Sequence, residues 1–229
     1  MTKTYGQFCG LARALDHIGD RWTLLVVREL LVAPARYGDL LGALEGVPTN
    51  LLADRLRQLE ADGLVVREHD PGDRRRTTYR LTPLGLGLEP ALLALIRWGA
   101  HWMRTGPEGD RLDPGWLLLA LRALLGERTA GREGTVEVRV GDGRLRVTGE
   151  RGARIRVERG SAPRAGAVVY GHPAPRAGAV VDGDPALLLG LASGLLTMAE
   201  ARRRGLRVGG DRPLARALLQ PGGRGPGGP

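Results

Sequence analysis

The sequence of 229 residues contains one cysteine, Cys9, and one lysine, Lys3. A single thiol cannot form an intrachain disulfide or supply the several thiolates of a structural zinc site. The histidines lie far apart in the sequence and form no ligand motif, so we expect neither a metal nor another cofactor. They are His17, His69, His101 and His172.

Long apolar runs are also missing, because none reaches the roughly eighteen residues that a membrane-spanning helix requires. The first six residues carry no apolar stretch of the kind found in signal peptides. We therefore expect a cytoplasmic protein with no membrane partner. The chain has no Ser-His-Asp arrangement, paired carboxylates, phosphate-binding loop or metal motif, so we expect no enzymatic activity.

The formal net charge of +9 comes almost entirely from arginine. Nucleotide-composition bias is one explanation, since alanine, glycine and proline are frequent as well, and affinity for polyanions is the other. Residues 1–105 carry 14 basic and 12 acidic residues, a net charge of +2, whereas residues 106–229 carry 20 and 13, a net charge of +7. Net charge alone would therefore place a nucleic-acid site in the second half.

Composition divides the chain into two domains and a tail. A stretch rich in glycine, proline and charge at 105–110 separates two apolar patterns, so we expect a first domain at 1–105, a linker at 106–112 and a second domain at 113–220. Residues 221–229 are almost all glycine and proline, which predicts a disordered tail. The same seven residues occur at 163–169 and 175–181, from either a tandem duplication or two matched strands.

The first half has the order of a winged helix-turn-helix. Apolar residues at helical spacing predict helices over about 11–18, 22–30, from 37 onward, and 49–61, with Gly63 as a C-cap. Strands at 64–69 and 77–81 flank a turn at 70–73, and a long helix is predicted over 83–103.

The predicted fourth helix has the features of a DNA-reading helix. Leu52, Leu56 and Leu59 share its inner face, so polar residues lie outward, where asparagine can bond adenine and arginine can bond guanine or phosphate. Three arginines at the tip of the following hairpin suit phosphate or minor-groove contact, although such a triplet alone is often a solvated loop. The DNA-binding candidates are Arg36, Thr49, Asn50, Arg55, Arg57, Arg74, Arg75 and Arg76.

Residues 9–103 resemble the HxlR-type family of bacterial winged-helix regulators. The similarity rests on CGLARAL at 9–15, IGDRWT at 18–23, RYGDL at 36–40, LADRL at 52–56, LEADGLV at 59–65, YRLT at 79–82 and WG at 98–99. The sequence departs from the family pattern at Gly10, where proline is usual, and in the wing, where DRRR replaces a proline-rich approach. The resemblance implies a transcriptional regulator that binds double-stranded DNA.

The resemblance also implies a homodimer through the first and last helices of this domain, on an inverted-repeat operator. Independently, the predicted helix over 83–103 has more apolar surface than a three-helix core can cover. The candidate interface residues are Leu88, Leu92, Leu95, Trp98 and Trp102.

Cys9 has two interpretations. The corresponding cysteine is a redox sensor in some relatives, and Arg13 one turn later would favour a thiolate. Neighbouring Phe8 and Leu11 instead favour a buried, structural cysteine, which is the expectation we give more weight.

The second half predicts an α+β domain, with helices packed on one face of a sheet. The patterns indicate helices at 116–125, 185–197 and 213–219, and strands at 135–140, 144–147, 154–157, 168–170 and 179–181. Arginine at alternate strand positions predicts one cationic, solvated sheet face.

This second segment, 113–219, resembles a sterol-carrier-protein-like domain in VDGDPALLL at 181–189, GLL at 194–196 and GLRVGGD at 205–211. The resemblance implies that Asp184 and Pro185 begin a helix and that an apolar cavity holds a hydrophobic effector. A packed domain that only aids dimerisation is the alternative. At the level of the whole chain, a lipid-binding or lipid-transfer protein with an accessory DNA-binding domain is the alternative to a ligand-responsive regulator.

Overall fold

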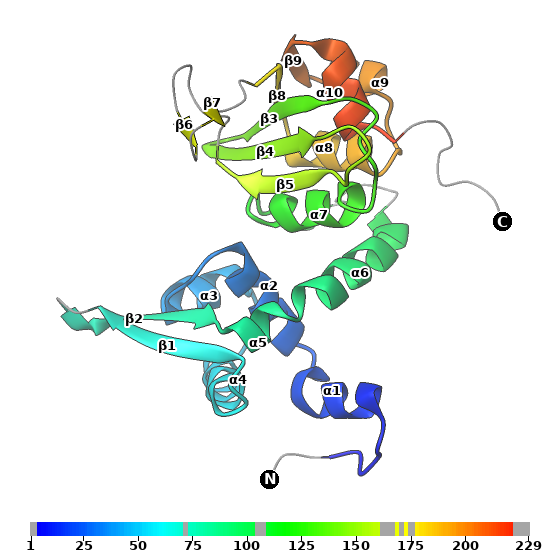
Figure 1. Ribbon diagram of the computed structural model, residues 1–229. Helices are drawn as coiled ribbons and strands as arrows, with labels where there is room; N and C mark the ends of the chain where they lie inside the picture. Colours follow the sequence, from blue (N-terminus) through cyan, green and yellow to red (C-terminus); the bar gives the residue numbers. More distant parts are fainter. Residues whose placement is uncertain are drawn as a thin grey trace. The chain divides into compact units, whose positions relative to one another are not determined.

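The computed structural model describes residues 4–70, 73–103, 109–160, 168–169, 172–173 and 177–221 (Figure 1). Contacts divide the chain into two compact units, residues 1–92 and 93–229. The division falls inside a helix. Residues 106–108 of the predicted linker and 222–229 of the predicted tail lie outside the described residues.

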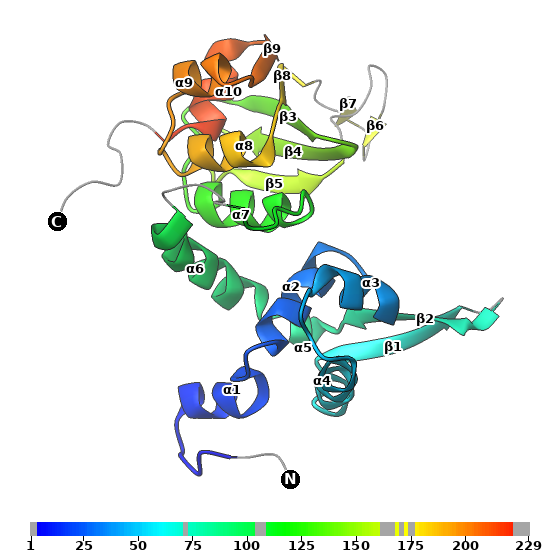
Figure 2. The ribbon, with the colours of Figure 1, turned by 180° about the vertical axis from the view of Figure 1, so that it is seen from behind.

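The first unit begins with four helices, as the sequence predicts (Figure 2). Leucines of the third and fourth helices and valines of the second are buried together, because each helix has one apolar face. The Asp20 carboxylate accepts hydrogen bonds from the backbone N–H groups of Trp22 and Thr23 and so holds the turn that leads into the second helix. The helices are α1 (Gly10–Ile18), α2 (Thr23–Val32), α3 (Tyr37–Ala43) and α4 (Thr49–Ala61).

A two-stranded wing of β1 (Val65–Asp70) and β2 (Asp73–Leu81) follows α4. Gly63, with φ of +70°, lies in the turn that ends α4, and this confirms its predicted place at the helix terminus. The strands pair antiparallel from Val65 opposite Leu81 to His69 opposite Thr77. Ala35 pairs with Tyr79 as an isolated bridge, so the segment before α3 is fixed to the base of the wing.

The predicted continuous helix over 83–103 is wrong. The structure has α5 (Pro83–Leu86), a two-residue turn, α6 (Glu89–Gly99) and a 3-10 turn, η1 (Ala100–Met103). Pro90 has no N–H to donate to the carbonyl one turn earlier, and Gly85 and Gly87 favour a break in the preceding segment.

The second unit contains a five-stranded sheet in the order β5-β4-β3-β8-β9, in which only the β3–β8 pair is parallel. A separate pair, β6 and β7, lies outside this sheet, and β6 covers residues 168–169 of the strand predicted at 168–170. Residue 170 lies outside the described residues. The strands are β3 (Gly134–Val140), β4 (Gly143–Gly149), β5 (Arg156–Arg159), β6 (Val168–Val169), β7 (His172–Pro173), β8 (Ala179–Asp182) and β9 (Arg207–Gly210).

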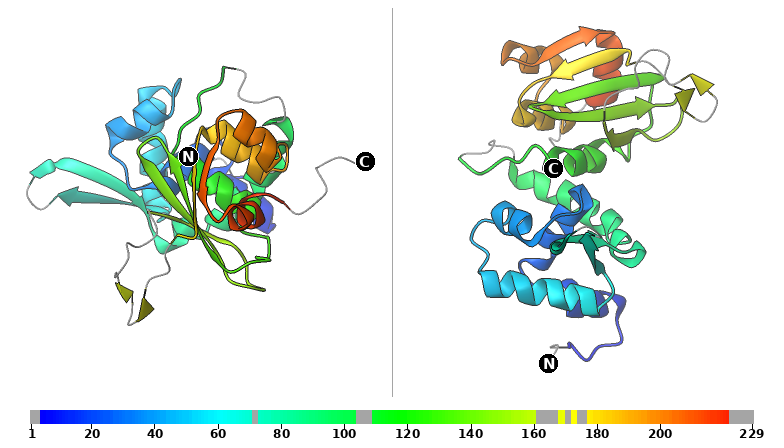
Figure 3. Two further views of the ribbon diagram at one scale, coloured as in Figure 1. Left: turned by 90° about the horizontal axis from the view of Figure 1, so that it is seen from above. Right: turned by 90° about the vertical axis from the view of Figure 1, so that its left-hand side faces the viewer.

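Helices cover one face of this sheet, as predicted (Figure 3). Alternate apolar residues of β3, β4 and β8, most of them valines, meet leucines of the helices in one hydrophobic core. The Asp184 side chain accepts a hydrogen bond from the Ala186 N–H, so the predicted N-cap before Pro185 is confirmed. The helices are α7 (Trp116–Leu125), α8 (Pro185–Ala192), α9 (Met198–Arg203) and α10 (Arg212–Leu219).

Two boundaries in this unit differ from the prediction. The helix expected over 185–197 ends at Ala192, since Gly194 has φ of +80°, and α9 begins separately in a capping box between Thr197 and Glu200. The strand expected at 154–157 is displaced to β5, because Arg154 is occupied in a single bridge with Thr129.

The predicted cationic sheet face is neutralised in part by acidic residues on the same face. Arg146 lies opposite Glu137 on one side and Glu158 on the other, and its guanidinium is 2.5 Å from the Glu158 carboxylate. Arg139 is 2.6 Å from Glu137, which is only 6% exposed. Sequence alternation placed the arginines on one face, but strand register sets acidic residues among them.

Candidate nucleic-acid interface

The helix-turn-helix consists of α3, the connection at 44–48 and α4. The Tyr37 hydroxyl donates to the Thr49 carbonyl at 2.7 Å, so the N-terminal ends of the two helices lie together. Arg36 precedes α3, is exposed, and follows directly on Ala35 at the base of the wing. Both helix N-termini present backbone N–H groups, which favours a phosphate at this edge.

The outer face of α4 carries three of the predicted DNA-binding residues. Thr49, Asn50 and Arg57 are exposed, while the leucines predicted to point inward are fully buried. The Arg57 guanidinium forms an ion pair with Asp54 on the same face. This pair holds Arg57 in place but leaves a carboxylate beside the surface that would face DNA.

Arg55 lies differently from the other candidates. Its Nε is 3.5 Å from Oδ1 of Asp20, which lies in the turn before α2, and the side chain is about one-third exposed. The geometry gives Arg55 a structural part in holding α4 against the turn before α2.

The wing carries Arg74, Arg75 and Arg76 in β2, and their side chains lie outside the described residues. The described part of the wing is held by cross-strand polar pairs. Arg80 donates to Glu68 at 2.5 Å, and the Thr77 hydroxyl is 3.1 Å from His69 Nδ1. These contacts fix the strands that present the tip.

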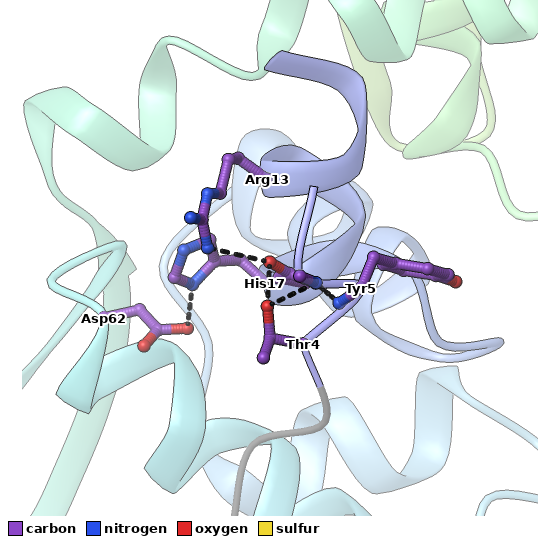
Figure 4. Close-up of polar contacts among 7 residues, drawn as sticks. Thr4, Tyr5, Arg13, His17 and Asp62 are labelled. Atoms are coloured by element: carbon purple, nitrogen blue, oxygen red, sulfur yellow. Dashed lines mark hydrogen bonds and ion pairs between the residues drawn. The ribbon is translucent and has the colours of Figure 1, made fainter. Parts of the chain in front are cut away.

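Polar contacts hold α1 and the segment before it (Figure 4). The Thr4 hydroxyl and the Tyr5 N–H donate to Asp16 at 3.0 and 2.8 Å. His17 Nδ1 lies 2.9 Å from an Asp62 oxygen at the end of α4. With Ala12 as its one buried residue, α1 is therefore positioned by polar contacts more than by a buried apolar face.

The other side of α1 exposes large apolar residues. Phe8 is fully exposed, Leu11 is 69% exposed and Leu15 is 39% exposed. The helical spacing of Leu11 and Leu15 indicated an apolar face, but periodicity cannot distinguish a face that meets the chain's own core from one that meets another chain.

The candidate interface residues after the wing differ in their exposure to solvent. Leu92 is buried and Leu88 is half-buried, whereas Leu95, Trp98 and Trp102 are 47%, 69% and 62% exposed. The two tryptophan rings pack edge to face with centroids 4.5 Å apart.

Cys9 is exposed, so the expectation of a buried cysteine is wrong. It occupies the N-cap of α1, and the backbone N–H groups of Ala12 and Leu11 lower the pKa of its thiol. The inference of burial from neighbouring Phe8 and Leu11 failed because both of these side chains are themselves exposed.

The rate of Cys9 alkylation by iodoacetamide is expected to rise with pH and to reach half its maximum at a lower pH than the rate for free cysteine, because the thiolate is the nucleophile. Mass spectrometry reports the rate without interference, since the chain has no second thiol. Unfolding in urea removes the helix N-terminus and should return the midpoint to the ordinary value, and a midpoint unchanged by unfolding would contradict the assignment.

Two further features concern membranes and metals. No described helix combines the length and apolar character needed to cross a membrane. Within the described ranges, no three His, Cys, Asp or Glu side chains come together in a group that could hold a metal ion.

Sequence comparison relates the first half of the chain to helix-turn-helix transcriptional regulators. The family model for an HxlR-like helix-turn-helix matches residues 17–107. An HTH-type transcriptional regulator of Synechocystis is 38% identical over 98 residues, which are 43% of this chain and 73% of that protein. An HTH-type transcriptional regulator of Bacillus subtilis is 33% identical over 40% of this chain and 84% of its own length. Another, of Mycobacterium bovis, is 40% identical over 43% of this chain and 61% of its own length. A solved MarR-family regulator from Enterococcus faecalis is 38% identical over 42% of this chain and 86% of that chain, with a TM-score of 0.37.

The exposed α4 and the adjacent wing define a winged helix-turn-helix transcriptional regulator. The chain belongs to the HxlR-like helix-turn-helix family. Membership implies DNA binding, and residues beyond 107 lie outside the family match.

Proposed function

We propose that the protein binds an inverted-repeat operator as a homodimer and regulates transcription in response to a ligand of its second domain. The exposed polar face of α4 beside the wing carries this proposal. Asn50 and Arg57 would read base edges in the major groove, Arg36 and Thr49 would fix the helix ends, and the wing arginines at 74–76 would contact phosphates. Arg55 supports α4 from behind.

The direct test is DNA binding by the full chain. Fluorescence anisotropy on duplexes tiled across the region upstream of its own gene should locate one site that binds at least about a thousandfold more tightly than the rest. We expect two half-sites about one helical turn apart, related by a twofold axis. Binding of all duplexes with equal affinity and a steep salt dependence would instead indicate an architectural protein.

Exposed apolar residues support the homodimer, because α1 and the segment from Leu95 to Trp102 both expose more large side chains than single surface residues usually do. Leu11→Glu and Trp98→Glu are each expected to raise the dimer dissociation constant at least about a hundredfold, since a charge is poorly tolerated in an apolar interface. Analytical ultracentrifugation measures this. Leu195→Glu is the matched control at an exposed leucine of the second unit, and dimers that survive both interface substitutions would exclude these surfaces.

Exposure and a lowered pKa also favour a switch at Cys9. We propose that oxidation or alkylation of this thiol changes operator affinity, because it lies at the start of α1, among the exposed residues proposed for dimerisation. Cys9→Ser should keep DNA binding and lose any response to diamide. A response retained in Cys9→Ser would exclude the switch.

We propose that the second domain, over about 113–220, is sterol-carrier-like and holds a hydrophobic effector. The capped helix at Asp184 and the one-sided α+β packing favour this. The alternative, a lipid-binding or lipid-transfer protein with an accessory DNA-binding domain, predicts uptake of a fluorescent fatty acid with no operator. A ligand that changes operator affinity would instead support the regulator.

A further inference from the structure

An open groove of about 1030 Å³ lies between α9 and α10 in the second unit. It is separate from the interior between sheet and helices, where leucines and valines form the packed core. The lining residues on which its chemistry depends are Met198, Ala199, Arg202, Val208, Arg212 and Arg216.

Partly buried polar contacts fix the walls of this groove. The Met198 N–H at the start of α9 donates to the Gln220 side chain at 3.0 Å, which ties that helix to the end of α10. The Arg128 guanidinium donates to the carbonyls of Ala217, Leu218 and Gln220 and holds the last turn of α10. Because these three hydrogen bonds occupy its guanidinium, Arg128 stabilises the fold, and partial burial lowers its pKa.

The groove concentrates positive charge. Four of its lining residues are arginines and none of its described lining residues is acidic. Arg132 is 3.6 Å from Asp211, which begins α10. Arg202, Arg212 and Arg216 have no ion-pair partner among the described residues.

Two of these arginines are placed to act together. Arg212 and Arg216 are four residues apart on α10, so they share one helix face. The nearest acidic residue on α9, Glu200, accepts from the backbone N–H of Thr197 at 2.8 Å as the partner in a capping box, which lowers the pKa of its carboxyl. An anion in the groove would therefore meet guanidinium groups without a competing carboxylate in its lining.

Apolar side chains line the rest of the groove. Met198 and Val208 are partly buried against the hydrophobic core, and Pro213 and Ala217 come from α10. A neutral hydrophobic molecule would leave the arginines without an anionic partner. An inorganic ion would leave the apolar surface of the groove exposed to water. A volume near the upper end of small-molecule sites suits a ligand with both parts.

We propose that the α9–α10 groove binds an amphipathic anion, an apolar chain or ring system that ends in a carboxylate or phosphate. Arg212 and Arg216 bind the oxyanion, with Arg202 opposite them, and the apolar body lies on Met198 and Val208. This inference rests on the ligand-responsive role proposed above and deepens it, because it assigns the effector a charge and moves its site from the sheet–helix interior to the α9–α10 groove.

The test is isothermal titration calorimetry on the full chain with three probes that share a ten-carbon chain. Decanoate and decyl phosphate are expected to bind at one site per chain, and decanol at least about tenfold more weakly, because charge-assisted hydrogen bonds contribute only to the first two. Acetate and inorganic phosphate, which lack the apolar body, should give no saturable heat. The tighter of the two long-chain anions identifies the head group.

Matched variants localise the site. Arg212→Gln and Arg216→Gln should each weaken decanoate about tenfold, whereas Arg203→Gln, an exposed arginine of α9 outside the lining, should leave it unchanged. Ala199→Asp places a carboxylate in the groove at a first-turn position where aspartate suits a helix, so it should abolish binding without unfolding α9, and Ala199→Ser should not.

Equal binding of decanol and decanoate, or equal losses in Arg203→Gln and Arg212→Gln, would overturn the proposal. Circular dichroism of each variant verifies that it is folded. Operator binding measured by anisotropy in the same samples separates the two proposals. If DNA binding is intact but decanoate binding does not depend on the arginines, the groove proposal alone is excluded. If decanoate binds and no operator is found, the proposed regulatory function is excluded.

Discussion

Arg57→Ala is expected to lower operator affinity roughly 10- to 100-fold and to remove the preference at one base pair of each half-site. Arg57 is exposed on α4, beyond the buried leucine face, where a bidentate contact to guanine contributes about 1–3 kcal/mol of discrimination. Anisotropy competition with operators substituted at each position measures both effects. Asn50→Ala should act in the same way at a different position, where adenine is read.

Part of the loss in Arg57→Ala comes from its neighbour. The ion pair with Asp54 disappears, which leaves an unpaired carboxylate facing the phosphates. The double variant Asp54→Ala with Arg57→Ala should therefore regain affinity for every sequence and regain no preference at the affected base pair. A double variant that restores the preference would show that Arg57 contacts phosphate only.

The wing provides the contrasting control. Arg75→Ala should weaken all duplexes roughly evenly and reduce the slope of log affinity against log salt by about one for each phosphate that the variant no longer neutralises. Arg55→Ala should lower thermal stability, because it removes the ion pair with Asp20. If Arg57→Ala and Arg75→Ala both leave DNA binding unchanged, α4 and the wing do not face DNA.

The sequence predicted the α3–α4 pair, the wing and the inner face of the second sheet, because each depends on periodicity within one segment. It missed features that depend on a distant partner. The helical pattern of α4 places Arg55 beside the outward-facing residues. Its side chain instead lies against Asp20, a residue that is distant in the sequence and that the pattern of α4 cannot reveal. The charge of the second sheet likewise depends on strand register, which alternation in a single strand does not contain.

Cys9 and α1 show a different limit. The apolar residues around Cys9 indicated burial, yet the structure leaves them exposed and holds α1 through Asp16 and the His17–Asp62 contact. Apolar periodicity reports that a face avoids water, and it does not report whether the covering surface belongs to the same chain. The sequence therefore could not separate the candidate dimer surface on α1 from a buried core face, because both have the same apolar spacing.

The short helix α5 packs closely against the junction between α4 and β1 at Gly85. Gly85→Ala is expected to destabilise the first unit by about 3 kcal/mol, a fall of roughly 10–20 °C in its unfolding temperature. A Cβ there would lie well inside contact distance of the Leu64 carbonyl oxygen and 3.0 Å from Leu81 Cδ2. The Leu64 carbonyl cannot easily retreat, because it accepts a hydrogen bond from the Thr82 N–H at 3.0 Å.

Gly42→Ala is the matched control for this substitution. Gly42 also lies in a helix, α3, but a Cβ there would meet nothing within 4 Å, so alanine should raise stability by up to about 1 kcal/mol through its helix propensity. Thermal unfolding by circular dichroism and hydrogen exchange over peptides 49–81 measure both variants in the full chain. Opposite signs at the two glycines would show that Gly85 is required by the close approach of α5 to the α4–β1 junction, which positions the recognition helix and the wing. Equal stabilisation at both would mean that the junction can open, and the fixed geometry proposed for the DNA-binding surface would fail with it.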